Sequence, residues 1–168
     1  MIHIYHGDGK GKTTASFGLA MRMLGYQKKI YITQFLKDGD SGEMLFLQTF
    51  DQVSLHYHKM PKMFYFQLEP SQQQEVARQQ HALFEAMCKE SKDFDLIILD
   101  EVLDAISLQM VSEEELILFL EEHKDQEIVL TGRNPSMRLL ELADYVVEMK
   151  NIKHPYQKQI PSRKGVEY

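Results

Sequence analysis

Short apolar runs recur along the chain at intervals typical of an α/β protein. The first run alternates apolar and polar residues, as a half-buried strand does, and the later runs are rich in β-branched and aromatic residues. Short runs of this kind favour strands over helices. The pattern predicts six strands, over residues 2–5, 30–35, 53–57, 95–100, 127–131 and 144–149.

Helical periodicity fills most of the gaps between these strands. We expect four helices: 13–24, closed by Gly25; 71–90, opened by Ser71; 112–123, opened by a Ser112–Glu115 capping box; and 134–143, opened by Asn134 with Pro135 at the first helical position. Residues 36–44 and 58–70 are expected to be irregular connections. The alternation favours an α/β fold with a mostly parallel six-stranded sheet, helices on both faces and a ligand crevice at the carboxyl ends of the strands.

Length and composition narrow the class of protein. The 168 residues, 43% of them hydrophobic, are enough for one core, so we expect residues 1–168 to form a single domain on which the basic tail 150–168 packs. The net charge of −6 argues against nucleic acid as a partner. No apolar run approaches the roughly 18 residues of a membrane span, and no secretory signal is evident. With Cys88 as the one cysteine, we expect a cytoplasmic protein without an internal disulfide.

The sequence HGDGKGKTT at residues 6–14 predicts a phosphate-binding loop. The consensus is Gly, four residues, Gly-Lys-Ser/Thr; here Gly11, Lys12 and Thr13 match, while His6 holds the first position with Gly7 after it. A predicted strand enters the loop and a predicted helix leaves it, which places backbone N–H groups around an anion. Lys12 is expected to neutralise phosphate oxygens and Thr13 to ligate Mg²⁺.

Two further candidate groups follow other predicted strands. Asp100 and Glu101 end the most hydrophobic strand, where a second carboxylate for a phosphate-bound Mg²⁺ belongs, although the sequence does not say which of them touches the ion. Arg133 follows the strand 127–131. Its guanidinium could fork onto phosphate or carboxylate oxygens, or brace the loop through backbone carbonyls, and both alternatives stay open.

The connection 60–66, MPKMFYF, holds three consecutive aromatic residues and two methionines. It folds back onto the core or forms a hydrophobic wall for a large flat ligand, and the two readings are equally favoured. His56 and His58 share one face of a strand, but the sequence shows no third ligand for zinc. Cys88 lies on the apolar side of a helix and is expected in the core.

Four stretches carry a recognisable order of motifs: YHGDGKGKTTASFGLAMRMLGY, ITQFLKD, DLIILDEV and LTGRNPSMRLLELADYVVEMKNIKHPYQKQIPSRKGVEY. Together, from about residue 2 to the C-terminus, they resemble the P-loop type of ATP:corrinoid adenosyltransferase. The resemblance implies that Co(I) of a reduced corrinoid attacks the 5′ carbon of ATP, forming adenosylcobalamin and releasing triphosphate. ATP, Mg²⁺ and the corrinoid are the expected ligands.

The resemblance also assigns roles to residues. The triphosphate would be held by Gly7, Asp8, Gly9, Lys10, Gly11, Lys12, Thr13, Thr14 and Arg133, and the metal by Thr13, Asp100 and Glu101. Lys12 would stabilise the leaving group. Phe64 and Phe66 match the aromatic pair that removes the corrinoid's lower axial ligand, although some relatives carry Phe and Trp there. An electron donor such as a reduced flavoprotein, and a homodimer, are also implied.

Two departures and two rivals accompany this interpretation. Many relatives cover the corrinoid with an N-terminal extension, whereas the first predicted strand begins here at residue 2, so the cover is expected from elsewhere or not at all. The proline of TGRNP stands one place away from its usual position. A P-loop kinase or ATPase, and a corrinoid- or ATP-binding module without turnover, are the alternative functions.

Overall fold

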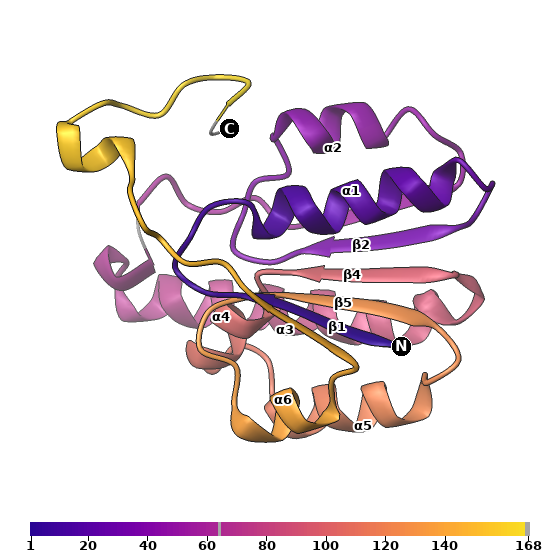
Figure 1. The fold of residues 1–168 in the computed structure, drawn as a ribbon. Coiled ribbons are helices and arrows are strands. Elements are labelled where there is room, and N and C mark those ends of the chain that lie inside the picture. Colours follow the sequence, from indigo (N-terminus) through magenta and orange to yellow (C-terminus); the bar gives the residue numbers. More distant parts are fainter. Residues whose placement is uncertain (64, 167–168) are drawn as a thin grey trace.

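The computed structural model describes residues 1–63 and 65–166, and their backbone confirms the predicted α/β fold. The strands are β1 (Ile2–His6), β2 (Ile30–Gln34), β3 (Val53–Tyr57), β4 (Leu96–Asp100), β5 (Glu127–Gly132) and β6 (Tyr145–Glu148). They form one sheet of order β3-β2-β4-β5-β1-β6, in which every pairing is parallel. All six strands therefore end at the same edge, on the left in Figure 1.

Helices cover both faces of the sheet (Figure 1). On one face, α1 (Lys12–Leu24) and α2 (Gly42–Leu47) bury Phe17 and Met44 against the side of β4 that carries Leu96 and Ile98. On the other face pack α3 (Pro70–Glu90), α4 (Val102–Ser107), α5 (Glu113–Glu122) and α6 (Met137–Leu142). Because successive residues of a strand point to opposite faces, the continuous apolar run of β4 serves both layers.

The helix boundaries differ from expectation at two points. The long helix begins at Pro70, and its N-cap is Glu69, whose side chain and that of Gln72 form a reciprocal capping box; Ser71 is inside the helix. Helix α6 begins at Met137 with Ser136 as its cap, because Asn134 takes a left-handed backbone conformation instead. The predictions of Ser71 and Asn134 as helix starts were therefore wrong. In each case another polar residue two positions away, Glu69 or Ser136, is the N-cap.

The strand order positions the candidate site. Strand β5 lies between β1 and β4 and pairs with both, so the phosphate loop after β1 and the carboxylates after β4 flank the end of β5. The chain beyond β6 passes beside the phosphate loop, where the Gly9 amide donates to the Met149 carbonyl at 2.7 Å. No helix among the described residues is long and apolar enough to cross a membrane.

Candidate active site

The phosphate loop lies between a strand and a helix, as its sequence predicts. It joins β1 to α1, with Gly11 as the N-cap in a left-handed conformation at φ 109°. Gly7 also has a positive φ, 113°, and a Cβ added there would lie 2.5 Å from the Met149 carbonyl oxygen. A Cβ on Gly9 would lie 2.6 Å from the same oxygen. The loop therefore needs glycine at these positions, because the backbone after β6 runs directly against it.

Lys12 folds its ammonium back over this loop. Its Nζ donates to the carbonyl oxygens of Gly7 at 2.7 Å and Gly9 at 2.9 Å, which leaves one of its three donors for an anion. Burial, followed by the charge of Arg133, lowers the pKa of Lys12. The Gly9 amide is directed to Met149, not toward an anion. The loop is held together by its own lysine before any phosphate arrives.

The two charged side chains at the middle of the loop contact the C-terminal tail. Asp8 Oδ1 accepts from the Asn151 amide at 3.2 Å, and Lys10 Nζ donates to the Val166 carbonyl. These contacts draw the basic tail over the loop. A phosphate contact by Asp8 or Lys10 stays a prediction.

Asp100 is fully buried at the end of β4 and saturated with hydrogen bonds. Its Oδ1 accepts from the hydroxyls of Thr13 at 2.8 Å and Thr131 at 2.6 Å, and its Oδ2 accepts from Gln34 Nε2 at 2.9 Å and Lys37 Nζ at 2.8 Å. Burial raises the pKa of a carboxyl, but here the charge of Lys37 and these hydrogen bonds outweigh it and lower the pKa. Asp100 is an ionised anchor that orients its neighbours.

Glu101 adopts a left-handed backbone conformation, φ 62° and ψ 19°, which costs a residue other than glycine on the order of 1–3 kcal/mol. Its amide donates to the Thr131 hydroxyl at 2.9 Å, and Oε1 lies 3.1 Å from Lys37 Nζ. Burial raises the pKa of Glu101 more than the charge of Lys37 lowers it. This conformation directs the Glu101 carboxylate toward Lys37, beside Asp100.

Lys37 is the central residue that sequence reasoning missed. Its Nζ lies 2.8 Å from Thr13 Oγ1 and 2.8 Å from Asp100 Oδ2, in addition to the contact with Glu101. Burial disfavours the ammonium, but the two carboxylates outweigh it and raise the pKa of Lys37. The sequence shows only that Lys37 lies just beyond β2. Its place in the site could be inferred only if β2 were known to lie beside β4.

The connection that carries Lys37 is fixed by a buried glutamine. Leu36 has a left-handed φ of 56°, and its amide donates to Gln80 Oε1 of α3 at 3.1 Å. Gln80 is fully buried, and its Nε2 lies 3.7 Å from the sulfur of Met60. Asp38 accepts from the Met60 amide at 2.6 Å. Gln80 and Asp38 thus join the connection that carries Lys37, residues 36–44, to residues 60–66, the aromatic connection.

The side chains predicted to hold a metal do meet. Thr13, Asp100 and Glu101 surround one point, which the Lys37 ammonium occupies. Two carboxylates and a hydroxyl suit Mg²⁺, which binds through one or two carboxylates and completes its shell with waters and substrate phosphates. Among the described residues no cluster of three or more His, Cys, Asp or Glu could hold a metal. A magnesium ion at this point stays a prediction.

Arg133 lies at the same edge and contacts Asp104 of α4. Its amide donates to Asp104 Oδ2 at 3.1 Å, and its guanidinium lies 3.9 Å from Asp104 Oδ1 with the side chain 62% exposed. Gly132, at φ 141°, leaves room for this contact, since a Cβ there would lie 2.6 Å from Asp104 Oδ2. The guanidinium thus approaches a carboxylate of α4 rather than the carbonyls of its own loop, and a fork onto phosphate and a brace through carbonyls both stay predictions.

A cavity of about 750 Å³ opens beside the phosphate loop, within the range of small-ligand sites. Its polar wall comes from the loop, Lys37 and Glu101. Its apolar wall comes from Phe17, Met21 and Phe46 on α1 and α2, and Val166 of the tail also lines it. The cavity combines a charged end with an apolar end, as a nucleotide site requires.

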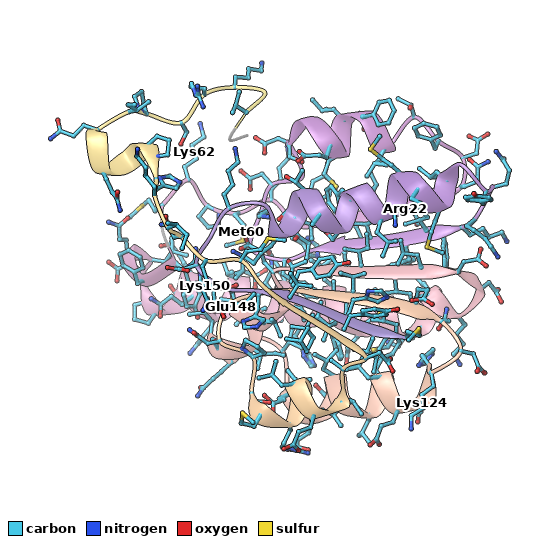
Figure 2. The ribbon with its side chains drawn as sticks, viewed as in Figure 1. Arg22, Met60, Lys62, Lys124, Glu148 and Lys150 are labelled. Atoms are coloured by element: carbon cyan, nitrogen blue, oxygen red, sulfur yellow. The ribbon has the colours of Figure 1, made fainter. Side chains whose placement is uncertain are left out.

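The aromatic connection lies on the same side of the molecule, where Figure 2 labels Met60 and Lys62, whereas Arg22 and Lys124 lie on the opposite side. Phe66, on the short 3-10 helix Tyr65–Gln67, is 75% exposed, while Tyr65 packs against the core. Phe64 lies outside the described residues. One aromatic ring thus packs inward and one is exposed, and a hydrophobic wall for a flat ligand stays a prediction.

The remaining motifs have structural neighbours. His56 stacks on Tyr31 with ring centroids 4.3 Å apart and shares a 2.7 Å hydrogen bond with Ser54, while His58 is exposed. Cys88 is half-buried against the core, as expected, and burial raises the pKa of its thiol to about 11. These residues lie outside the cluster around Asp100.

Comparison with known proteins identifies the family. The protein-family model described as ATP:corrinoid adenosyltransferase BtuR/CobO/CobP matches residues 1–168 of this chain. The corrinoid adenosyltransferase of Escherichia coli (strain K12) is 31% identical over 100% of this chain and 85% of its own length. The corrinoid adenosyltransferase of Pseudomonas aeruginosa is 30% identical over 100% of this chain and 83% of its own length. Corrinoid adenosyltransferase CobA of Salmonella typhimurium is 28% identical over 100% of this chain and 85% of its own length. This chain belongs to the ATP:corrinoid adenosyltransferase family.

Proposed function

We propose that this protein transfers the 5′-deoxyadenosyl group of ATP to Co(I) of a reduced corrinoid, forming adenosylcobalamin and releasing triphosphate. One observation carries the proposal: a phosphate loop joined to Asp100 through Thr13, in a chain that matches this family over its whole length. A phosphate loop and a buried carboxylate alone would serve a kinase equally well. The family match selects among these chemistries.

The protein's contribution is to hold the triphosphate as a single leaving group. The cobalt supplies the electron pair of the new Co–C bond, and the C5′–O bond of ATP breaks with its pair moving to the triphosphate. Lys12, the loop amides and the N-terminus of α1 stabilise the charge that collects on the departing oxygen. No proton is transferred and no phosphoanhydride bond breaks, so the site needs no general base.

Mg²⁺ is the cofactor that we propose for this site. When bound, it neutralises charge on the triphosphate. Thr13 and Glu101 are its proposed protein ligands, since Asp100 is fully buried and already accepts from the Thr13 and Thr131 hydroxyls and from Gln34. Asp100 would then orient the Thr13 hydroxyl instead of touching the ion.

The corrinoid is proposed to approach from the aromatic connection. Phe66 and Met63 are both strongly exposed there, and their apolar side chains could contact a large flat ligand. Phe66, together with Phe64 as its expected partner, would exclude water and the lower axial ligand beneath the cobalt. Because the reaction consumes Co(I), the proposal includes a reducing partner such as a reduced flavoprotein. A homodimer in the cytoplasm is proposed from the family resemblance.

An anaerobic assay with ATP, Mg²⁺ and chemically reduced cobalamin tests the function. We expect the absorption spectrum of the alkylated corrinoid and an equal amount of triphosphate, with neither product when the corrinoid is omitted. ADP and phosphate formed without corrinoid would instead indicate a kinase or ATPase. Binding of both ligands with no adenosylated product would indicate a binding module.

A further inference from the structure

We propose that Lys37 is a resident cation that occupies the magnesium position of the nucleotide-free protein and leaves it when Mg²⁺ enters with ATP. The inference rests on the proposed function only in naming ATP as the nucleotide. It assigns to Lys37 the task of keeping a preformed metal site closed to metal alone.

The contacts of the ammonium carry the first step. Lys37 Nζ lies 2.8 Å from Thr13 Oγ1, 2.8 Å from Asp100 Oδ2 and 3.1 Å from Glu101 Oε1. An ammonium has three donors, and these three oxygens take all of them. They belong to the three side chains predicted to surround the metal, of which Thr13 and Glu101 are its proposed ligands. One cation already fills the place that the ligand set provides.

Geometry then excludes simultaneous occupation. Mg²⁺ lies about 2.0–2.1 Å from its oxygen ligands. An ion at that distance from Thr13 and Glu101 would overlap or closely approach the present position of Lys37 Nζ, and two cations so close together in a largely buried site repel strongly. Mg²⁺ can enter only if the ammonium moves.

Burial explains why the lysine is there at all. Asp100 is fully buried, and a buried carboxylate without a cation or full hydrogen bonding is strongly unfavourable. Gln34, Thr13 and Thr131 satisfy its other lone pairs but carry no charge. Lys37 supplies the positive charge that keeps Asp100 and Glu101 paired while no metal is bound.

The surroundings give the ammonium a place to go. The Lys37 side chain is 31% exposed, and it lines the cavity of about 750 Å³ together with Lys12, Thr13 and Thr14. The backbone before it stays fixed through the Leu36–Gln80 hydrogen bond, so rotation of the side chain alone can turn the ammonium into the cavity. Polyphosphate oxygens beside Lys12 would receive it there. Mg²⁺ and the polyphosphate must therefore arrive together.

Binding of Mn²⁺ without nucleotide tests this directly. Mn²⁺ prefers the same oxygen ligands as Mg²⁺, and electron paramagnetic resonance measures its free concentration. We expect Lys37→Met, which keeps the length of the side chain but not its charge, to bind Mn²⁺ alone at least about tenfold more tightly than the unmodified protein. Lys37→Arg should show no gain. Adding Glu101→Gln to Lys37→Met should abolish the gain, which places the ion at this site.

Two lysines serve as controls. Lys12 donates to Gly7 and Gly9 carbonyls rather than to the carboxylates, so Lys12→Met should gain much less affinity for Mn²⁺. Lys124, which lies away from the carboxyl edge in Figure 2, should gain none when changed to Met. Equal gains in all three variants would mean a general charge effect and would overturn the proposal.

Thermal unfolding gives an independent readout. The Lys37→Met protein should lose stability without metal and recover it with Mn²⁺, because the ion replaces the missing ammonium; if the variant is unfolded, added Mn²⁺ should restore its circular dichroism spectrum. Unaltered Mn²⁺ affinity in Lys37→Met, or tight Mn²⁺ binding by the unmodified protein without nucleotide, would overturn the inference. Neither measurement involves a corrinoid, so a failure of the proposed transferase activity would leave it standing.

Discussion

The hydroxyl of Thr13 donates a 2.8 Å hydrogen bond to Oδ1 of Asp100, joining the first turn of α1 to the end of β4. Thr131 of β5 donates to the same oxygen, and its hydroxyl accepts from the Glu101 amide. Three elements thus fix the side chains at the end of the sheet before a ligand binds. Such preorganisation is what a site that works by electrostatic stabilisation requires.

Thr131→Val should lower the free energy of unfolding by about 1–3 kcal/mol, because a buried oxygen of Asp100 and the partly buried Glu101 amide each lose a partner while the side chain keeps its shape. Urea unfolding followed by circular dichroism measures the change.

Thr33→Val is the matched control. Thr33 is equally buried, on β2, and its hydroxyl has no hydrogen-bond partner among the described residues. Replacing an unsatisfied hydroxyl by a methyl group should leave stability unchanged or raise it slightly. Similar losses at the two threonines would show that the Thr131 network contributes nothing beyond packing.

Lys12→Ala should lower turnover on the order of a hundredfold or more, because a preorganised donor to the leaving group is lost. The rate of adenosylated corrinoid formation under anaerobic conditions measures it. Lys124→Ala, on an exposed position away from the loop, should retain full activity. Undiminished turnover in Lys12→Ala would contradict the proposed role of the phosphate loop.

Phe66→Ala should slow the reaction more with a corrinoid that carries a lower axial ligand than with one that lacks it. The exposed ring is proposed to exclude that ligand, so its loss matters only where there is a ligand to exclude. The measurement compares the rates of adenosylation of the two corrinoids, each reduced under the same conditions. Tyr26→Ala removes another highly exposed ring, outside this connection, and should change neither rate; equal slowing of both corrinoids in Phe66→Ala would remove this role.

Cys88 should react slowly with iodoacetamide in the folded protein. Burial, with a smaller contribution from the charge of Glu115, raises the pKa of its thiol to about 11 from a usual value near 9, and only the thiolate reacts. At pH 8 the rate of alkylation of Cys88 should therefore be roughly a hundredfold lower in the folded protein than in the urea-unfolded chain. Mass spectrometry of the alkylated protein measures this rate. Because the shift favours the protonated thiol, the folded rate should still be rising above pH 9, where the unfolded rate levels off.

The elements that could be predicted from the sequence are those with a strong local pattern. All six strands appear where the apolar runs indicated, and the phosphate loop lies between a strand and a helix as its spacing required. The short helices α2 and α4 were not predicted, because six residues carry too little periodicity to distinguish them from a loop. Helix starts were misplaced where two polar residues near the boundary could each act as the cap.

The phosphate-loop motif was enough to predict that Thr13 meets Asp100 and Glu101, because such a loop implies a metal-binding carboxylate at the end of another strand, and these two end the most hydrophobic one. The place of Lys37 was decided only by the tertiary structure, because it depends on β2 lying beside β4 and on a left-handed turn at Leu36 held by Gln80 from a distant helix. The same holds for the close approach of Met149 to the phosphate-loop glycines. Hydrophobic periodicity is a local property, whereas the meeting of side chains depends on strand order, which no local pattern specifies.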